Sequence, residues 1–160
     1  MNWRELETFS FGDNPTLADE LLALVLEGKK RATCWAVSEG LKGVAIGKSM
    51  VELDSEGRPR VVLQTRELVQ RRFEDVDHQF AYDEGEGDRS LACWRAAHEH
   101  YFARLGLFQP NMMLWCERFS ECCSRFAEAT LPRSTILGYA RLGMRLRRCS
   151  GPYRMMRSRS

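Results

Sequence analysis

The sequence contains no run of about 18 consecutive apolar residues, which excludes an ordinary membrane-spanning helix. Its first nine residues are polar and acidic, unlike the basic and then apolar start of a secretory signal peptide. Six cysteines are present, but they form no CxxC pair and show no other zinc-ligand spacing. We therefore expect a soluble, cytoplasmic protein with no membrane partner, in which all six cysteines are reduced.

Several common catalytic and ligand-binding motifs are also missing. Segment 43–49 has three residues between its outer glycines, whereas a phosphate-binding loop needs four. The acidic segment 83–88 is not a calcium loop of the EF-hand type, because Arg89 stands where that loop needs glycine. His98 and His100 are two residues apart, whereas the helix of a zinc protease needs four, and no GxSxG motif is present.

Charge is distributed unevenly along the chain. Residues 1–123 carry 15 Lys and Arg against 21 Asp and Glu, whereas residues 124–160 carry nine Arg, no Lys and one acid. An acidic body argues against broad binding of a phosphate backbone, which needs many cationic contacts. We predict one folded domain over 1–123 and a basic, Arg-rich extension over 124–160 that is poorly ordered or nonessential. The alternative is a functional basic arm that holds RNA.

The pattern of apolar residues predicts two helices and several short strands. Leucines and valines recur at helical spacing after Asn14, with Thr16 and Asp19 as a capping box and Gly28 as the end of the helix. A second helix is expected to begin near Leu91, with Asp88 or Ser90 as its cap. Strands are predicted at 33–37, 50–53, 60–69 and 111–119. This pattern indicates an α+β fold, a small β-barrel with helices packed around it.

Two clusters of charged residues are candidates for chemistry. Lys29, Lys30 and Arg31 follow the first helix, where cations favour the helix dipole, and Thr33 follows at the start of a strand. In a functional interpretation, a desolvated Lys30 removes the proton of the Thr33 hydroxyl and creates a nucleophile. Trp35 lies beside these cations, either as a core residue or as a platform for a base.

The second cluster is the acidic segment 83–88, which contains Glu84 and Glu86 and precedes the second predicted helix. Acids near a helix N-terminus are expected for electrostatic reasons alone. In a functional interpretation, one carboxylate accepts a hydrogen bond from a nucleobase amino group or orients Lys30. No cofactor is predicted, although weak binding of a divalent metal by these acids remains open.

Taken together, these segments resemble the ASCH family, a branch of the PUA-like superfamily. The resemblance starts with 11–15 before the first helix and continues with 28–33, which fits a GxKxxT pattern. Segments 84–88 and 116–119 follow in the family's order, so that the match runs from about residue 9 to 120. It implies a PUA-like β-barrel with a groove between the barrel and the first helix.

The resemblance also implies a set of site residues. Some members of the family are amidohydrolases that act on an N4-acetylated cytidine nucleoside with Lys, Thr and Glu, and others are ribonucleases. By position, the catalytic residues would be Lys30, Thr33 and Glu84, with Glu86 as the other candidate for the acid. Trp35 stands where other members carry an arginine. Ligand-binding roles are expected for the neighbouring residues Lys29, Arg31, Trp35 and Glu86.

Three functions follow from these residues. The first is binding of RNA or a nucleoside in the groove, with possible hydrolysis of an N4-acylated cytidine by Thr33. The second is a metal-assisted ribonuclease that uses Glu84 and Glu86. The third is a non-catalytic RNA-binding module, with Lys29, Lys30 and Arg31 on phosphates.

Overall fold

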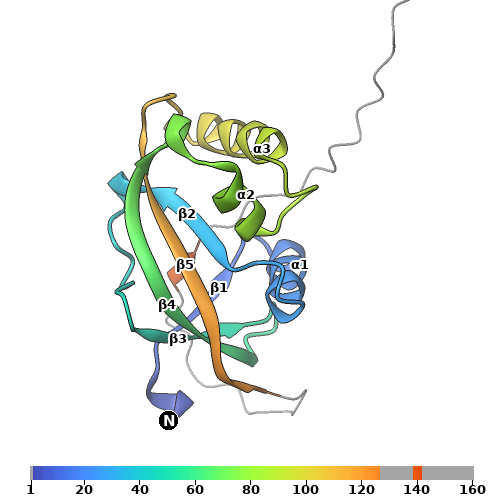
Figure 1. The fold of residues 1–160 in the computed structure, drawn as a ribbon. Coiled ribbons are helices and arrows are strands. Elements are labelled where there is room, and N and C mark those ends of the chain that lie inside the picture. The colour runs from blue at the N-terminus through green and yellow to red at the C-terminus, as the bar shows by residue number, and fades with distance from the viewer. Residues whose placement is uncertain (1, 127–138, 142–160) are drawn as a thin grey trace, which may run out of the picture.

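The computed structural model describes residues 2–126 and 139–141 of the chain (Figure 1). Its strands are β1 (Thr8–Phe11), β2 (Ala32–Ala36), β3 (Ser49–Leu53), β4 (Pro59–Arg72), β5 (Met113–Arg125) and β6 (Tyr139–Arg141). Its α-helices are α1 (Pro15–Leu26), α2 (His78–Glu84) and α3 (Leu91–Arg104). Short 3-10 turns occupy Trp3–Glu5, Val37–Glu39 and Phe73–Asp75. The α+β class predicted from the sequence is confirmed, while α2 and β1 were not predicted.

The strands form one mixed sheet in the order β2-β5-β4-β3-β1-β6. β1 runs parallel to β3, and the pairs β3/β4, β4/β5 and β2/β5 are antiparallel. No pairing within the described residues joins β2 to β1 or β6, so the sheet is open and the predicted closed barrel is wrong. At the start of the edge strand β2, the backbone N–H of Arg31 donates to the carbonyl of Asp83, 2.7 Å away. Helix α2 therefore occupies the place where another strand would close the sheet.

The pair of long strands β4 and β5 forms the centre of the sheet. Their pairing extends from Val61 opposite Arg125 to Arg72 opposite Met113, with a register shift between Thr65 and Glu67. Such a shift twists the strands and changes which side chains face the helices. β5 continues to Arg125, beyond the predicted domain boundary at 123, and most of the predicted basic extension lies outside the described residues.

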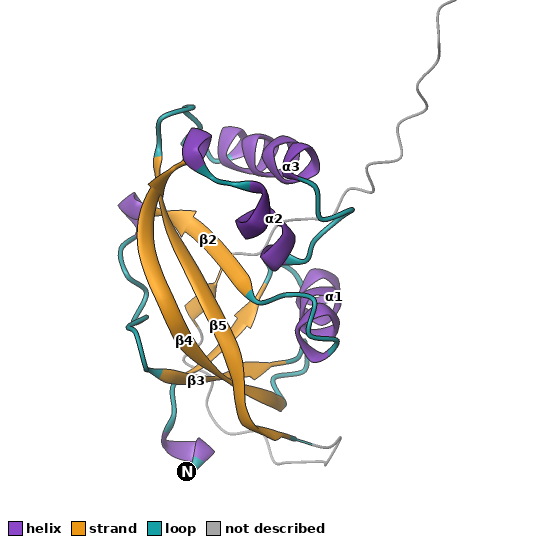
Figure 2. Cartoon of the chain, viewed as in Figure 1, coloured by secondary structure: helices purple, strands orange, loops and turns teal. Residues whose placement is uncertain are grey.

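Helices cover the sheet in two groups. In Figure 2 the three α-helices lie to the right of the twisted strands, with α2 and α3 above α1. Buried side chains from α2 and α3 pack against β2 and β5, and those from α1 pack against β1, β3 and β4. Because burial of apolar surface is the main stabilising term, these two cores fix where each helix can sit. None of the helices in the described ranges has the length and apolar character needed to cross a membrane.

The helix caps are partly those expected from the sequence. Asn14 caps α1, since its side chain accepts a hydrogen bond from the backbone N–H of Leu17 at 3.0 Å. The predicted Thr16/Asp19 capping box is wrong, because Asp19 instead accepts hydrogen bonds from the backbone and hydroxyl of Ser55. Of the two caps considered for α3, Ser90 is the one observed.

The prediction that all six cysteines are reduced is also wrong. Cys93 is disulfide-bonded, whereas Cys34, Cys116 and Cys122 are free. Spacing alone did not identify Cys93, since no metal or disulfide pattern includes it.

The turn between β3 and β4 is organised around one buried carboxylate. Asp54 is 3% exposed and accepts hydrogen bonds from the side chains of Arg58 at 2.7 Å and Arg60 at 3.2 Å. It also accepts from the backbone N–H groups of Glu56 and Arg58. Burial raises the pKa of Asp54, but these hydrogen bonds outweigh it and hold the pKa below its ordinary value.

We expect Asp54→Asn to lower stability at neutral pH and to have less effect in acid. Because the folded pKa is depressed, the carboxylate stabilises the fold above the unfolded pKa of about 3.9, and this contribution is lost as pH falls through the lower folded pKa. Urea unfolding of both proteins between neutral and acidic pH measures the difference. Glu56→Gln, at an exposed carboxylate of the same turn, is the control. A difference that stays constant down to strong acid would contradict this role.

Candidate functional site

Lys30 enters the protein interior directly after α1. The backbone turns at Gly28, whose φ of +70° lies in the left-handed region that favours glycine. The N–H groups of Lys29 and Lys30 then donate back to the carbonyl of Leu24, at 2.9 and 3.0 Å. This tight end of the helix carries Lys30 inward, and the residue is 1% exposed.

The ammonium of Lys30 lies among acidic groups. Its Nζ is 2.6 Å from Glu86 Oε1, 3.4 Å from the backbone carbonyl of Glu84 and 4.0 Å from Glu84 Oε2. The ring of Phe11 lies on another side, with its centroid 5.3 Å from Nζ. Burial alone would lower the pKa of Lys30, but Glu86 and Glu84 outweigh it and raise the pKa above its ordinary value. Lys30 is therefore held as a cation.

Helix α2 and the glycine after it position the two acids. Asp77 caps α2 by accepting a hydrogen bond from the N–H of Phe80, and Gly85 ends it with a φ of +76°. Gly85 lies so close to the Lys29–Lys30 peptide that a Cβ there would be 2.5 Å from the Lys29 carbonyl oxygen. The sequence predicted an acidic loop here, whereas Glu84 is the last residue of a helix and only Glu86 lies in the loop.

Glu84 faces a second layer of side chains beneath Lys30. Its Oε2 is 3.5 Å from Nε2 of His98, which lies on α3 and stacks on Trp94 with 3.9 Å between ring centroids. Burial raises the pKa of Glu84, but His98 and Lys30 lower it, and the net result is a pKa below the ordinary value. Glu84 is 2% exposed, whereas the Glu86 side chain is 13% exposed, so Glu86 is the acid nearer to solvent.

Thr33 is buried but lies apart from the two acids. It is 3% exposed and pairs with Glu117 of β5. Neighbouring side chains alternate across a strand, and Cys34 is the one that faces α2 and α3. Within the described residues, the Thr33 hydroxyl makes no hydrogen bond with Lys30 or Glu84. The structure thus brings Lys30, Glu84 and Glu86 together, and among the described residues Thr33 is not hydrogen-bonded to them through its side chain.

The other predicted ligand-binding residues lie in different environments. Lys29 is exposed and pairs with Glu27 at 2.7 Å, and Arg31 is exposed and pairs with Asp83 at 3.1 Å. Trp35 is 3% exposed and its indole N–H donates to the Gly40 carbonyl at 2.8 Å. Its ring therefore packs inside the protein and offers no open face for stacking in this structure.

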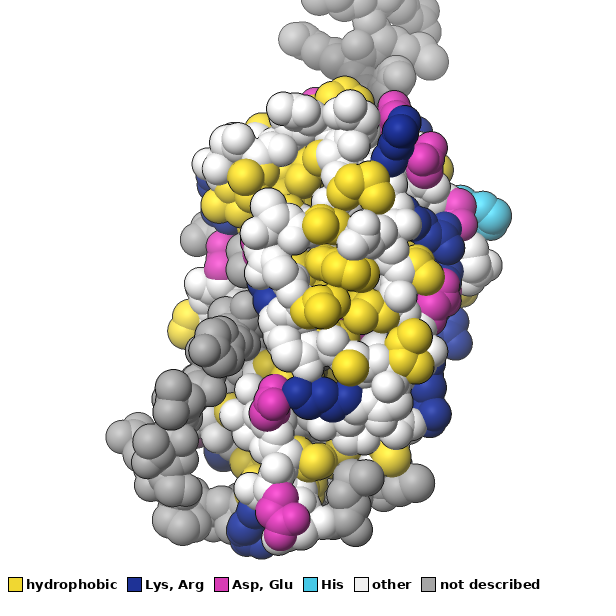
Figure 3. All heavy atoms as spheres, turned by 90° about the vertical axis from the view of Figure 1, so that its left-hand side faces the viewer, with side chains coloured by type: hydrophobic (Ala, Val, Ile, Leu, Met, Phe, Trp, Pro, Cys, Tyr) yellow, Lys and Arg dark blue, Asp and Glu magenta, His cyan; other side chains and the backbone are white. Residues whose placement is uncertain are grey.

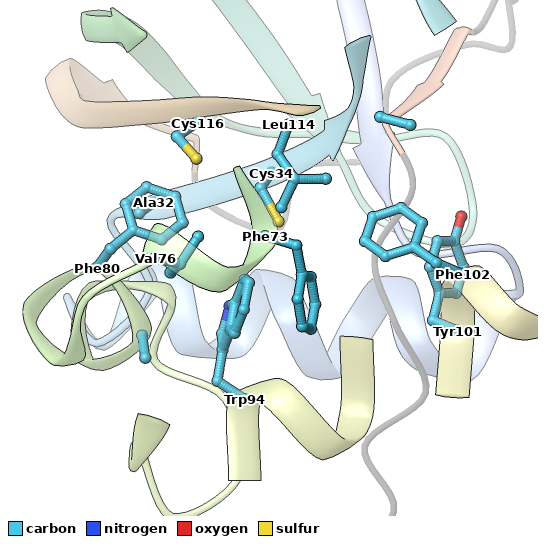
Figure 4. Packing of buried hydrophobic residues seen from close by; sticks show 12 residues of the cluster. Ala32, Cys34, Phe73, Val76, Phe80, Trp94, Tyr101, Phe102, Leu114 and Cys116 are labelled. Carbon is cyan, nitrogen blue, oxygen red and sulfur yellow. The ribbon is translucent and has the colours of Figure 1, made fainter. Parts of the chain in front are cut away.

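Sequence reasoning missed two residues of this region, Cys34 and His98. Cys34 extends from β2 toward the helices, and Figure 4 shows its sulfur and that of Cys116 pointing the same way from adjacent strands. Periodicity indicates that both are buried, because Cys34 lies in an apolar strand and His98 lies one helical turn after Trp94, but it does not indicate that they approach Glu84.

The comparison with protein families identifies the chain. The ASCH domain model matches residues 7–122, which is most of the chain. The chain belongs to the ASCH domain family. The matched range includes Lys30, Glu84, Glu86 and His98, so the whole buried cluster lies inside the ASCH domain. A comparison with curated proteins finds no match.

Solved structures support the same family. The ASCH domain from Lactobacillus crispatus JV V101 is 31% identical with a TM-score of 0.65, and the match covers 72% of this chain and 78% of that one. Protein EF3133 from Enterococcus faecalis V583 is 25% identical with a TM-score of 0.63, covering 72% and 76%. The hypothetical protein PH0355 is 9% identical with a TM-score of 0.51, covering 72% and 99%, which shows a likeness of fold alone.

Proposed function

We propose that this ASCH domain binds RNA or a nucleoside at the Lys30–Glu86 pair. The observation that supports this best is the buried ammonium of Lys30, which lies 2.6 Å from Glu86 and 4.0 Å from a second carboxylate, that of Glu84. Removing such charges from water costs several kcal/mol per ion, and apolar residues of similar size often give a more stable protein. Charged groups that persist in such a place are candidates for a functional site.

The two members of the pair suit different parts of a cytosine-like ligand. Glu86 is the carboxylate nearer to solvent, and it would accept a hydrogen bond from an exocyclic amino or amide N–H. Lys30, kept charged by its neighbours, would donate to a carbonyl oxygen of the ligand. A ligand bound in this way replaces part of the Lys30–Glu86 contact, so that neither charge is left buried without a partner.

Hydrolysis of an N4-acylated cytidine is the catalytic form of this proposal. It requires that Thr33, whose side chain lies on the other face of β2 from Cys34, reach the bound acyl group. Thr33 Oγ would then attack the acyl carbon, the cytosine amine would leave, and water would release the acyl group from Thr33. The raised pKa of Lys30 makes this residue a better donor to the developing oxyanion than an acceptor of the Thr33 proton. We therefore assign Lys30 to oxyanion stabilisation, and Glu86 in place of Glu84 to the contact with the leaving amine.

We expect the unmodified protein to bind N4-acetylcytidine or a short cytidine-containing RNA, and Glu86→Gln to weaken that affinity by about tenfold or more. Thr33→Ala should retain binding and lose any release of acetate. Glu27→Gln, which changes an exposed acid outside the cluster, is the matched control and should behave as the unmodified protein. Calorimetric titration measures affinity, and chromatography of the nucleoside measures turnover.

Two results would overturn the proposal. One is an unmodified protein that binds neither the nucleoside nor the RNA, and the other is an unchanged affinity in Glu86→Gln. Binding without turnover in the unmodified protein would reject the catalytic form and keep the binding site.

A non-catalytic RNA-binding module is the second candidate. Lys29 and Arg31, the neighbours of Lys30 in the sequence, are more than half exposed, so that they would be able to contact phosphates. On the face shown in Figure 3, by contrast, apolar side chains gather in the middle, and Lys and Arg lie chiefly along the right-hand edge. A long nucleic acid would therefore find few cations on that face.

A further inference from the structure

Three buried side chains of different chemistry meet beneath Lys30. They are Cys34 of β2, Glu84 of α2 and His98 of α3, and each is at most 4% exposed. The Cys34 sulfur, a carboxylate oxygen of Glu84 and a ring nitrogen of His98 all lie within 4.8 Å of one another. The residues are far apart in the sequence, so the packing of the two helices on the sheet brings them together.

The orientation of the His98 ring directs Nε2 toward this cluster. Nδ1 is 2.9 Å from the carbonyl oxygen of Trp94, and because a carbonyl only accepts, Nδ1 must carry a hydrogen. Stacking on Trp94 fixes the plane of the ring. Nε2 then points toward Glu84, where neither Nε2 nor Glu84 Oε1 has a hydrogen-bond partner among the described residues. Nε2 of the neutral ring and the Glu84 carboxylate are both acceptors, so that either a proton or a metal ion between them would satisfy both atoms.

The balance of charge also leaves room for a cation. Lys30 is one ammonium beside two carboxylates, and it contacts Glu86 at 2.6 Å but Glu84 only at 4.0 Å. The negative charge of Glu84 is therefore only partly compensated by Lys30. A divalent ion bound by Glu84 and a Cys34 thiolate would make the local charge neutral, which favours burial.

We propose that Cys34 Sγ, the Glu84 carboxylate and His98 Nε2 bind one Zn²⁺ ion. Sulfur, imidazole and carboxylate are the ligands zinc prefers, whereas Mg²⁺ and Ca²⁺ prefer oxygen alone. A metal-bound histidine commonly donates its other N–H to a backbone carbonyl, as Nδ1 does here. The inference goes beyond the proposed function, since the ion would bind without any nucleoside.

The spacing of the three side chains requires only a small adjustment. The 3.5 Å between His98 Nε2 and Glu84 Oε2 is near the separation of about 3.3 Å expected for nitrogen and oxygen around tetrahedral zinc. Separations of up to 4.8 Å within the group would shorten by about 1 Å. Binding replaces the Cys34 thiol hydrogen by the Zn–S bond and releases one proton to solvent.

A titration of the metal-stripped full chain with Co²⁺ tests the site. Co²⁺ accepts the same ligands as zinc, and a cobalt–thiolate bond gives a near-ultraviolet charge-transfer absorption. We expect this absorption to saturate at one equivalent, to disappear when Zn²⁺ is added, and to be lost in Cys34→Ser. Cys116→Ser is the matched control, because Cys116 is a free buried thiol directly opposite Cys34 but outside the group. This variant should retain the absorption.

X-ray absorption of the unmodified protein loaded with Zn²⁺ keeps the test valid if a variant fails to fold. It should show one sulfur at about 2.3 Å and nitrogen or oxygen ligands at about 2.0 Å. Three results would overturn the proposal. The cobalt–thiolate absorption could be absent, it could persist in Cys34→Ser, or zinc could be surrounded by oxygen ligands alone. Nitrogen NMR showing a doubly protonated His98 that does not change when Zn²⁺ is added would also overturn it. None of these measurements uses a nucleoside, so they stand or fall separately from the proposed function.

Discussion

Replacing Gly85 by alanine is expected to destabilise the protein by about 3 kcal/mol or more, one of the largest effects of a single methyl group in this chain. A Cβ at this position would lie 2.5 Å from the carbonyl oxygen of Lys29, 2.6 Å from its carbonyl carbon and 2.8 Å from the nitrogen of Lys30. All three are backbone atoms, so no side chain can rotate away. Thermal or urea unfolding measures the loss, which corresponds to about 2–4 °C in Tm per kcal/mol.

Gly28→Ala is the matched control for that prediction. Gly28 has a φ of +70°, close to the +76° of Gly85, but a Cβ there would meet no atom within 4 Å. Its substitution therefore measures the cost of a left-handed alanine alone, about 1–2 kcal/mol. Equal losses in the two variants would show that Gly85 is required only for its backbone angle and that the close contact with the Lys29–Lys30 peptide is unimportant.

Lys30→Met is expected to lower stability by about 3–5 kcal/mol, since it removes the cation and leaves the two carboxylates buried together. Glu86 loses a partner at 2.6 Å, and Glu84 loses one at 4.0 Å as well as the hydrogen bond to its backbone carbonyl. Methionine fills much of the volume of the lysine chain, so the loss reports the charge more than a cavity. Urea unfolding gives the free energy.

A double-mutant cycle separates the ion pair from general damage. Adding Glu86→Gln to Lys30→Met removes the carboxylate that has lost its partner, so the double variant should be more stable than the sum of the two single changes predicts, by about 1 kcal/mol or more. Lys48→Met is the control, because Lys48 pairs with Glu7 at a more exposed site. Strict additivity of Lys30→Met and Glu86→Gln would show that the two charges do not stabilise each other.

The sequence predicted local elements well because their signals are local. Ser90, one of two caps considered, caps α3 through its own side chain, and the alternation after Pro59 is that of a half-buried strand. The Lys30 position and the acidic segment were likewise visible as short patterns. These features depend on neighbours a few residues apart, which a single sequence contains.

Features that depend on distant contacts were not predicted. The seven-residue helix α2 has too few turns for a clear period, so the segment containing Glu84 was taken for a loop. Whether the sheet closes depends on whether a strand pairs with the free edge of β2. No local sequence pattern indicates which element will lie at that edge. The approach of His98 to Glu84 is a consequence of tertiary packing that an apolar helix face does not reveal. Of the two roles considered for Trp35, the structure shows the core one.

The segment after α1 is joined at three successive residues to the end of α2 and to the loop that follows it. The carbonyl of Lys29 accepts from Arg89, Nζ of Lys30 donates to the carbonyl of Glu84, and the N–H of Arg31 donates to the carbonyl of Asp83. Two of these contacts use a side chain, that of Arg89 or of Lys30, and the third joins two backbone groups. Insertion or deletion of one residue on either side would separate all three donors from their acceptors at once. The number of residues between Gly28 and Thr33 is therefore constrained by these contacts.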